Sequence, residues 1–289
     1  MIEISHLTKK YGKHAAVDDL SLTIESGKIY GFLGPNGAGK STTMNMITGY
    51  LGATSGTIKI DGEDIFENPE KARMKIGYLP ELPPLYQEML VEEYLYFAAE
   101  LKKIPKKERK QAVEEVMEQT GVDEVSGRLI KNLSKGYKQR VGLAQAILGY
   151  PEVIILDEPT VGLDPKQIIE MRDLIKKLGE NHTVILSSHI MQEISAVCEY
   201  VFIISKGKLV AADTLENLEN RSTKDRTFEV EVMGDKAKAE KMVQAISQLR
   251  SFEIEEGSEG HSKITIHYGK DKSLEDVFLE LTEGREEEC

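Results

Sequence analysis

Cysteine, positive charge and long hydrophobic runs are all scarce in this chain of 289 residues. Only Cys198 and Cys289 occur, without metal-ligand spacing, which favours a reduced cytosolic setting over a disulfide-bonded secreted domain. The formal net charge of −12 argues against nucleic acid as the main ligand, because phosphate backbones require a basic surface. No apolar run approaches the roughly 18 residues that span a bilayer, and residues 1–10 lack the apolar stretch of a secretory signal. We expect a soluble protein that reaches a membrane only through a partner.

The chain is organised around residues 29–43, IYGFLGPNGAGKSTT. Gly34, Gly39, Lys40 and Ser41 occupy the fixed places of G-x-x-x-x-G-K-[ST], between an apolar run and a helical period. Glycines let backbone amides surround a phosphate, while the lysine supplies charge for the β- and γ-phosphates and the serine an oxygen ligand for Mg²⁺. A Gly-rich turn with a purely structural role matches only part of this pattern, so we predict a nucleoside triphosphate site. Its expected residues are Gly34, Pro35, Asn36, Gly37, Ala38, Gly39, Lys40, Ser41 and Thr42.

Apolar runs and helical periods alternate along most of the chain, which predicts an α/β protein with a parallel sheet. Strands are expected at 28–33, 56–62, 76–79, 153–156, 183–186 and 200–205, the last paired with 208–212. Apolar–polar alternation at 2–4 and 20–24 predicts a small antiparallel sheet, with 9–13 as the turn. Helices are expected after Lys40, up to about Leu178, and near 190–197.

The middle of the chain is predicted to be helical. Three prolines within 80–84 predict a stiff hinge, after which one helical face runs from Leu90 to Leu101. A second helix ends at Gly121, and its apolar face comprises Ala112, Val113, Val116, Met117 and Thr120. The same helices carry basic side chains: Lys102, Lys103, Lys106, Lys107, Arg109 and Lys110. They indicate a solvated face, and contact with anionic lipid or a partner is the alternative.

A polar, charged stretch at 216–224 predicts a domain boundary, followed by a small α+β domain. Its strands are expected at 228–232, 252–254 and 264–267, and its helices at 237–249 and 274–281. Residues 285–289 form an acidic tail that we expect to fray.

Asp157 and Glu158 directly follow a fully apolar strand, at the edge where α/β sheets hold their sites. We expect Asp157 to orient Mg²⁺, through water, and Glu158 to polarise an attacking water as general base. The alternative is an acidic pair that only caps a loop. Tyr11 has two interpretations from its residue type alone: it stacks on a nucleotide base, or it packs partly buried against its own loop.

Residues 1–215 resemble the ATP-binding subunit of ABC (ATP-binding cassette) transporters. The phosphate loop and 153–158 are similar to the Walker A and Walker B motifs, and LSKGYKQR at 133–140 is similar to the signature sequence. Gly162-Leu163-Asp164 resembles the D-loop, and His189 resembles the switch histidine.

The resemblance also implies roles for single residues. Tyr11 matches the adenine-stacking aromatic, which strengthens the first interpretation of that residue. Glu81 stands where the family usually has a glutamine that contacts Mg²⁺ and the attacking water, so the implied metal ligands are Ser41, Glu81 and Asp157. Glu158 and His189 are the implied catalytic residues, and Asp164 communicates between the two ATP sites.

The implied assembly is a head-to-tail dimer, with itself or with a related subunit, that holds two ATP molecules and Mg²⁺ between its subunits. The signature residues that contact the ATP of the other subunit are Leu133, Ser134, Lys135, Gly136 and Gln139. The expected fold is an α/β P-loop NTPase with a parallel core sheet and an N-terminal antiparallel β subdomain. A helical signature subdomain at about 82–150 lies within the ATP-binding domain, and 225–289 form the small C-terminal α+β domain.

Within the family, the YLPE hinge, the LSKGYKQR signature and LEDVFLELT near the end are most similar to ATPases of ABC-2-type exporters of drugs and antibiotics. This implies an ATP-hydrolysing motor that lies at the inner face of the cell membrane through separate permease subunits. The alternatives are an importer ATPase, a soluble ABC ATPase that acts on ribosomes or DNA, and a module that binds ATP without turnover. The acidic chain with one phosphate loop argues against the second alternative, and the presence of Glu158 and His189 argues against the third.

Overall fold

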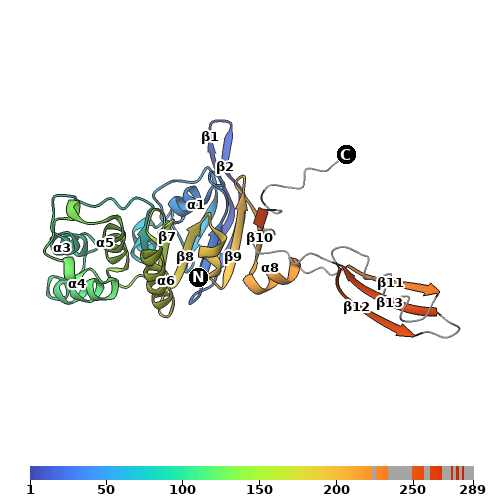
Figure 1. Ribbon diagram of the computed structural model, residues 1–289. Helices are drawn as coiled ribbons and strands as arrows, with labels where there is room; N and C mark the ends of the chain where they lie inside the picture. Colours follow the sequence, from blue (N-terminus) through green and yellow to red (C-terminus); the bar gives the residue numbers. More distant parts are fainter. Residues whose placement is uncertain are drawn as a thin grey trace. The chain divides into compact units, whose positions relative to one another are not determined.

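The computed structural model describes residues 1–222, 226–233, 249–256 and 261–268, together with Glu275, Phe278, Leu279 and Thr282 (Figure 1). Contacts divide the chain into two units, Met1–Thr214 and Leu215–Cys289. Among the described residues, no helix has both the length and the apolar character needed to cross a membrane.

The first unit is built around a six-stranded sheet of order β10-β9-β3-β8-β7-β6. Its strands are β3 (Ile29–Leu33), β6 (Ile76–Leu79), β7 (Val153–Asp157), β8 (Thr183–Ser188), β9 (Tyr200–Ser205) and β10 (Lys208–Thr214). Adjacent strands from β9 to β6 pair in parallel, and only β10 is antiparallel to its neighbour. Every residue of β3, β7 and β8 is buried, because helices cover both faces of a parallel sheet. The predicted parallel core is confirmed.

The strand order places three strand ends side by side. Since β8 lies between β3 and β7, the loop after Leu33, the segment after Ser188 and the pair Asp157-Glu158 meet at the carboxyl edge of the sheet. This edge is where open α/β sheets hold their ligands. Segments more than 100 residues apart in the sequence are therefore brought to one place.

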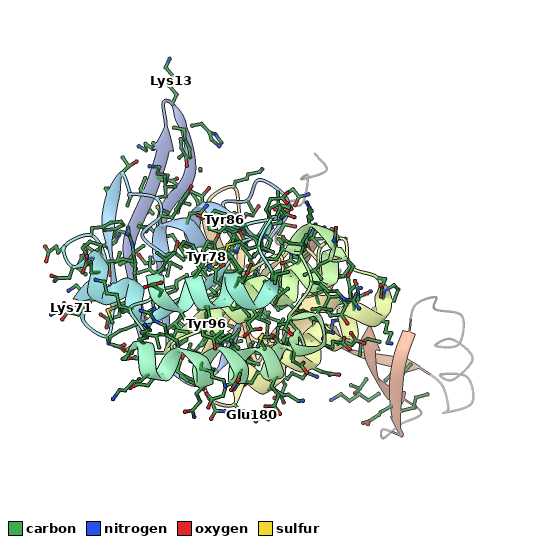
Figure 2. The ribbon with its side chains drawn as sticks, turned by 90° about the vertical axis from the view of Figure 1, so that its left-hand side faces the viewer. Lys13, Lys71, Tyr78, Tyr86, Tyr96 and Glu180 are labelled. Atoms are coloured by element: carbon green, nitrogen blue, oxygen red, sulfur yellow. The ribbon has the colours of Figure 1, made fainter. Side chains whose placement is uncertain are left out.

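A second, antiparallel sheet of order β2-β1-β4-β5 contains β1 (Ile2–Tyr11), β2 (His14–Ile24), β4 (Ser55–Ile60) and β5 (Glu63–Asp64). The predicted turn at 9–13 is wrong, because Lys9, Lys10 and Tyr11 continue β1 and pair with Val17, Ala15 and His14. The turn is only Gly12-Lys13, with Lys13 at the tip of the hairpin (Figure 2). Backbone pairing with β2 keeps these polar residues in the strand. Their side chains can be polar because one face of an antiparallel sheet can be exposed to water.

Four helices accompany the two sheets: α1 (Lys40–Ile47), α2 (Pro69–Met74), α6 (Pro165–Gly179) and α7 (Met191–Ser195). The helix α6 begins after Asp164, whose carboxylate accepts a hydrogen bond from the Gln167 amide at 2.9 Å, as an N-cap does. The main core joins both sheets and α1, with Phe32, Met44 and Ile60 completely buried.

The middle region gathers three helices beside the sheet (Figure 1): α3 (Val91–Leu101), α4 (Lys106–Thr120) and α5 (Lys135–Ile147), with short 3₁₀ turns at Asp123–Val125 and Ile130–Asn132. All five predicted apolar-face residues of α4 are buried, and the helix ends at Gly121 with φ 64°. The predicted face of α3 is wrong at Leu101, which is 65% exposed at the last turn, whereas Leu95 and Ala99 are buried. Residues 80–86 contain no helix or strand, as the prolines predict.

The basic cluster is solvated at Lys103, Lys106, Lys107 and Lys110, but not at Lys102 or Arg109. Arg109 is partly buried, and it donates to the Ile104 carbonyl oxygen at 2.8 Å and pairs with Glu100. The Lys102 ammonium donates to the carbonyl oxygens of Ala146 at 2.8 Å and Leu148 at 2.7 Å, at the end of α5. It follows the last residue of α3, where its stem turns inward. Burial lowers its pKa from the ordinary value of 10.5 to about 8.

Lys102 predicts a pH dependence of stability. Between about pH 8 and 10.5 the unfolded chain binds more protons at this group than the folded chain, so the free energy of unfolding rises with pH in this window. The neutral amine still donates to both carbonyls. We expect urea unfolding to show this rise for the unmodified chain and to lack it for Lys102→Met. Equal pH slopes for the two proteins would contradict the lowered pKa.

The second unit contains α8 (Leu215–Ser222), β11 (Arg226–Met233), β12 (Leu249–Glu256) and β13 (His261–Tyr268). The strands form an antiparallel sheet of order β11-β13-β12. The three predicted strands are present, while Leu249 belongs to β12 and not to the predicted helix. The rest of that helix and the tail 285–289 lie outside the described residues; of the predicted helix 274–281, Glu275, Phe278 and Leu279 are helical, as is Thr282 just after it.

Candidate nucleotide site

The loop after β3 has the backbone of a phosphate cradle. Gly37 and Gly39 adopt φ of 79° and 103°, a region that glycine enters without steric cost. A Cβ on Gly39 would lie 2.4 Å from the Ala16 carbonyl oxygen, so no side chain fits there. The Ala38 carbonyl accepts a bond from the Gly207 amide at 2.9 Å, which anchors the loop to the turn between β9 and β10. The loop is thus fixed from outside.

Lys40 lies within this loop and is almost fully buried. Its ammonium donates to the carbonyl oxygens of Gly34 at 2.7 Å and Pro35 at 3.3 Å, and lies 3.4 Å from a Glu158 oxygen. The cation is therefore held at the centre of the loop, where it can attract a phosphate.

Oxygen ligands suited to Mg²⁺ converge beside it. The Ser41 hydroxyl donates to Asp157 Oδ1 at 3.2 Å, and the Ser187 hydroxyl donates to the same oxygen. Among the described residues no three His, Cys, Asp or Glu side chains form a metal site by themselves. This donor set fits Mg²⁺, which usually completes its shell with phosphate oxygens and water.

Glu158 and His189 face each other at the same edge. Glu158 is 6% exposed, and His189 Nδ1 lies 3.0 Å from Glu158 Oε2. The backbone of Glu158 has φ 49°, and its amide donates to the Ser187 carbonyl and hydroxyl oxygens, each at 3.2 Å. Ser187 thus contacts both carboxylate residues, a role that our sequence analysis missed although its place at a strand end pointed to it.

A cavity of about 510 Å³ joins these groups to the β1–β2 hairpin. It is lined by Tyr11, His14, Ala16, Asn36, Gly37, Gly39, Lys40, Ser41, Thr42, Glu81, Glu158, Val161 and His189. Tyr11 is 53% exposed, and the Lys9 ammonium lies 5.3 Å from its ring centroid. An exposed ring at the end of a phosphate cavity suits base stacking better than packing against its own loop.

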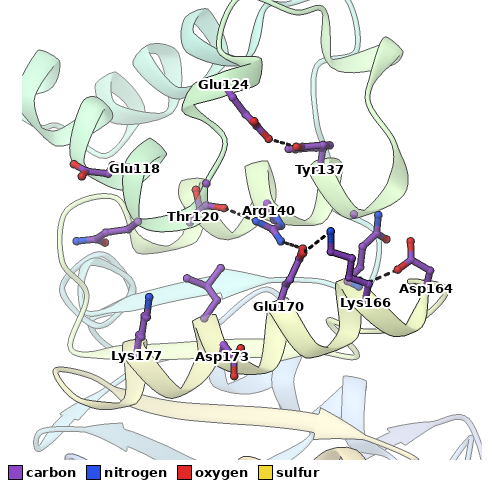
Figure 3. A pocket seen from close by; sticks show the side chains of 15 residues that line it. Glu118, Thr120, Glu124, Tyr137, Arg140, Asp164, Lys166, Glu170, Asp173 and Lys177 are labelled. Carbon is purple, nitrogen blue, oxygen red and sulfur yellow. Dashed lines mark hydrogen bonds and ion pairs between the residues drawn. The ribbon is translucent and has the colours of Figure 1, made fainter.

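The signature residues lie outside this cavity. Ser134 is the N-cap of α5, and its hydroxyl accepts from the Tyr137 amide at 3.4 Å. Gly136 and Asp164 line a different cavity, of about 600 Å³, between α4, α5 and α6 (Figure 3). There Arg140 pairs with Glu170, which also lies 3.7 Å from Lys166. One chain therefore presents its phosphate loop and its signature in separate places.

Gln139 does not share the exposed position of Ser134. It is 1% exposed, and its side-chain amide donates to the Glu81 carbonyl oxygen at 2.9 Å. This burial contradicts the predicted contact with the ATP of another subunit, because Gln139 lies on the inner face of α5. The side chain of Leu133, which is 7% exposed, contradicts the same prediction. Helical spacing alone does not tell which face of a helix turns inward when both carry polar residues.

Comparisons with known proteins agree with this arrangement. The sequence model of the ABC transporter family matches residues 17–161. A bacitracin transport ATP-binding protein of Bacillus licheniformis is 38% identical over 282 residues, 97% of this chain and 90% of that protein. The linearmycin resistance ATP-binding protein of Bacillus subtilis is 36% identical over 235 residues, 81% of this chain and 76% of that protein.

Solved structures extend the similarity to the fold. A dimeric bacterial ABC transporter cassette has a TM-score of 0.68 and 26% identity, over 74% of this chain and 99% of that chain. The same cassette was also solved in a post-hydrolysis state with bound ADP and Pi. The predicted resemblance is confirmed: the chain belongs to the ABC transporter family, in which it is an ATP-binding subunit that hydrolyses ATP to drive transport.

Proposed function

We propose that two copies of this chain, or this chain and a related subunit, pair head to tail with two ATP molecules between them. The observation that carries the proposal is the separation of the phosphate cavity from Ser134 within one chain. The free amides at the start of α5 form an anion site, which suits the γ-phosphate of ATP bound to the partner. A two-fold axis completes both sites at once, and a dimeric relative supports this arrangement.

The proposed residue roles use groups that line or flank the cavity. The phosphates are held by the Lys40 ammonium and by backbone N–H groups of the loop, except at Pro35, which has none, and at Gly34 and Ala38, whose amides donate to the carbonyl oxygens of Ser188 and Pro35. Tyr11 stacks on the adenine. Ser41, Asp157 and Glu81 would hold Mg²⁺, which would supply positive charge against the phosphates. Glu158 accepts a proton from the attacking water, and its neighbour His189 donates a hydrogen bond to the γ-phosphate. The buried position of Glu158 keeps its carboxylate out of bulk water.

We further propose export through a separate permease, at the inner face of the cell membrane. Relatives named for bacitracin transport and linearmycin resistance support an antibiotic-like cargo. Beside the hinge, the side chains of Tyr50 and Leu82 are 84% and 76% exposed, which suits contact with the permease. The groove of about 620 Å³ that they line also contains Ser41, Glu81 and Asp157, so the permease contact lies next to the proposed metal ligands. In this proposal 1–215 form the ATP-binding domain, with the helical subdomain at about 82–150, and 225–289 form the C-terminal domain.

The shared site predicts an ATP-dependent dimer. In a Glu158→Gln background, which slows hydrolysis, we expect size-exclusion chromatography with light scattering to show a dimer only with Mg-ATP. Ser134→Arg places a long side chain where the γ-phosphate of the partner binds, so it should abolish this dimer while the monomer still binds ATP. Ser195→Arg, at an exposed position of α7, is the control. A dimer that survives Ser134→Arg would refute the shared site.

A further inference from the structure

We propose that Gln139 is a positioning residue that couples the ATP site of its own subunit to the signature that serves the partner. It does so through the backbone of Glu81. The inference rests on the proposed function for the roles of Ser134 and Glu81. It replaces the direct ATP contact that the signature resemblance implied for Gln139.

The contact between α5 and the hinge is tight along successive turns of the helix. Gln139 donates to the Glu81 carbonyl oxygen at 2.9 Å. One turn later, a Cβ on Gly142 would lie 2.7 Å from Leu79 and 2.9 Å from Pro83. Another turn on, a Cβ on Gly77 would lie 2.3 Å from the Ala146 carbonyl oxygen. The helix therefore lies directly on β6 and the hinge, and Gln139 makes the contact nearest to its first turn.

The two ends of this contact reach different ATP molecules. Glu81 lines the nucleotide cavity of its own subunit. Ser134 caps the same helix that carries Gln139, about 7.5 Å away along the helix axis at 1.5 Å per residue. A shift of the Glu81 backbone when ATP and Mg²⁺ bind is thus transmitted to Ser134 by a rigid helix. Without the hydrogen bond, the apolar contacts at Gly142 still hold the helix, but its first turn loses its link to the site.

The chemistry of Gln139 makes this role separable from folding. Its Oε1 is buried without a hydrogen-bond partner, so one of the two polar groups of the side chain contributes nothing favourable. Leucine is of similar size and removes both the donor and the unpaired acceptor. The Glu81 carbonyl belongs to an exposed residue and can bind water instead. Gln139→Leu should therefore fold as stably as the unmodified chain.

The test compares Gln139→Leu and Gln111→Leu in the Glu158→Gln background. Gln111 is an exposed glutamine of α4 that bonds to Glu115, so the same substitution there controls for the change of residue type. We expect Gln139→Leu to raise the ATP concentration for half-maximal dimer formation about three- to tenfold, the range of one lost hydrogen bond. ATP affinity of the monomer and the urea midpoint should not change, and Gln111→Leu should behave as its parent.

A matching split is expected in steady-state hydrolysis by chains that retain Glu158: the KM for ATP rises by the same factor, and kcat at saturating ATP stays within about twofold. Unchanged dimer formation by Gln139→Leu overturns the inference, and so does an equal loss of ATP affinity by its monomer. The Ser134→Arg variant separates the two proposals. If Ser134→Arg abolishes the dimer and Gln139→Leu leaves it unchanged, only the role of Gln139 is wrong.

Discussion

Replacement of Glu158 by glutamine is expected to lower ATP turnover about a hundred- to ten-thousandfold, the usual contribution of a general base, while ATP binding persists. The variant keeps the size of the side chain and can still hydrogen bond to His189, but it cannot accept the proton of the attacking water. It also removes the negative charge 3.4 Å from Lys40, which leaves the cation free for phosphate. The checks are phosphate release at saturating Mg-ATP and ATP affinity by equilibrium binding.

The matched control is Glu193→Gln. Glu193 is equally buried at 6% exposure, and it accepts a hydrogen bond from Ser188 at 2.7 Å, but it does not line the nucleotide cavity. The ATP turnover of Glu193→Gln should stay within about threefold of that of the unmodified chain, because the side-chain amide still has an oxygen that accepts the hydrogen bond from Ser188. If the two variants lose activity equally, the loss at Glu158 reports a buried carboxylate and not a base.

Gly39→Ala is expected to weaken ATP binding about a hundredfold or more. Its φ of 103° is strained for any residue with a side chain, and its Cβ would lie 2.4 Å from the Ala16 backbone. That strain costs about 1–3 kcal/mol before the overlap is counted, and the relief of the overlap must move the loop or β2. Because the loop amides bind phosphate only in register, the displaced loop loses several contacts at once.

Gly37→Ala separates the two causes. It has φ 79°, and nothing lies within 4 Å of the added Cβ, so it carries the strain without the overlap. We expect its ATP affinity to fall about five- to thirtyfold at most, since αL costs about 1–2 kcal/mol for a residue with a side chain. Isothermal titration with ATP measures both variants. Equal losses would show that backbone strain, and not the contact with Ala16, controls the loop.

The sequence predicted the carboxyl edge of the core sheet well, because each motif there follows a run of apolar residues. Gly34 and His189 come just after such strands, Asp157 is the last residue of another, and parallel pairing brings strand ends together. Where the sequence is mainly polar, tertiary contacts determine which element a residue joins and whether its side chain turns inward. Lys9 and Lys10 lie in β1 because β2 pairs with the backbone there, and Lys102 turns inward to the end of α5.

The direction of a side chain was harder to predict than its element. The start of α5 was placed by its signature, yet only the structure shows that Ser134 faces outward and Gln139 inward. Both are polar, so no hydrophobic period distinguishes them. The face of α5 that turns inward is fixed by its contacts with residues 77–83, which are distant from α5 in the sequence.

The left-handed backbone conformation of Glu158 lowers the stability of the fold at a position where the proposed activity needs a side chain. With φ at 49°, the folded chain keeps a cost of about 1–2 kcal/mol at this residue whether or not a nucleotide is bound. Glycine would remove that cost, but it would also remove the carboxylate. If Glu158 is the general base proposed above, a more stable fold and a working motor place opposite demands on this one position.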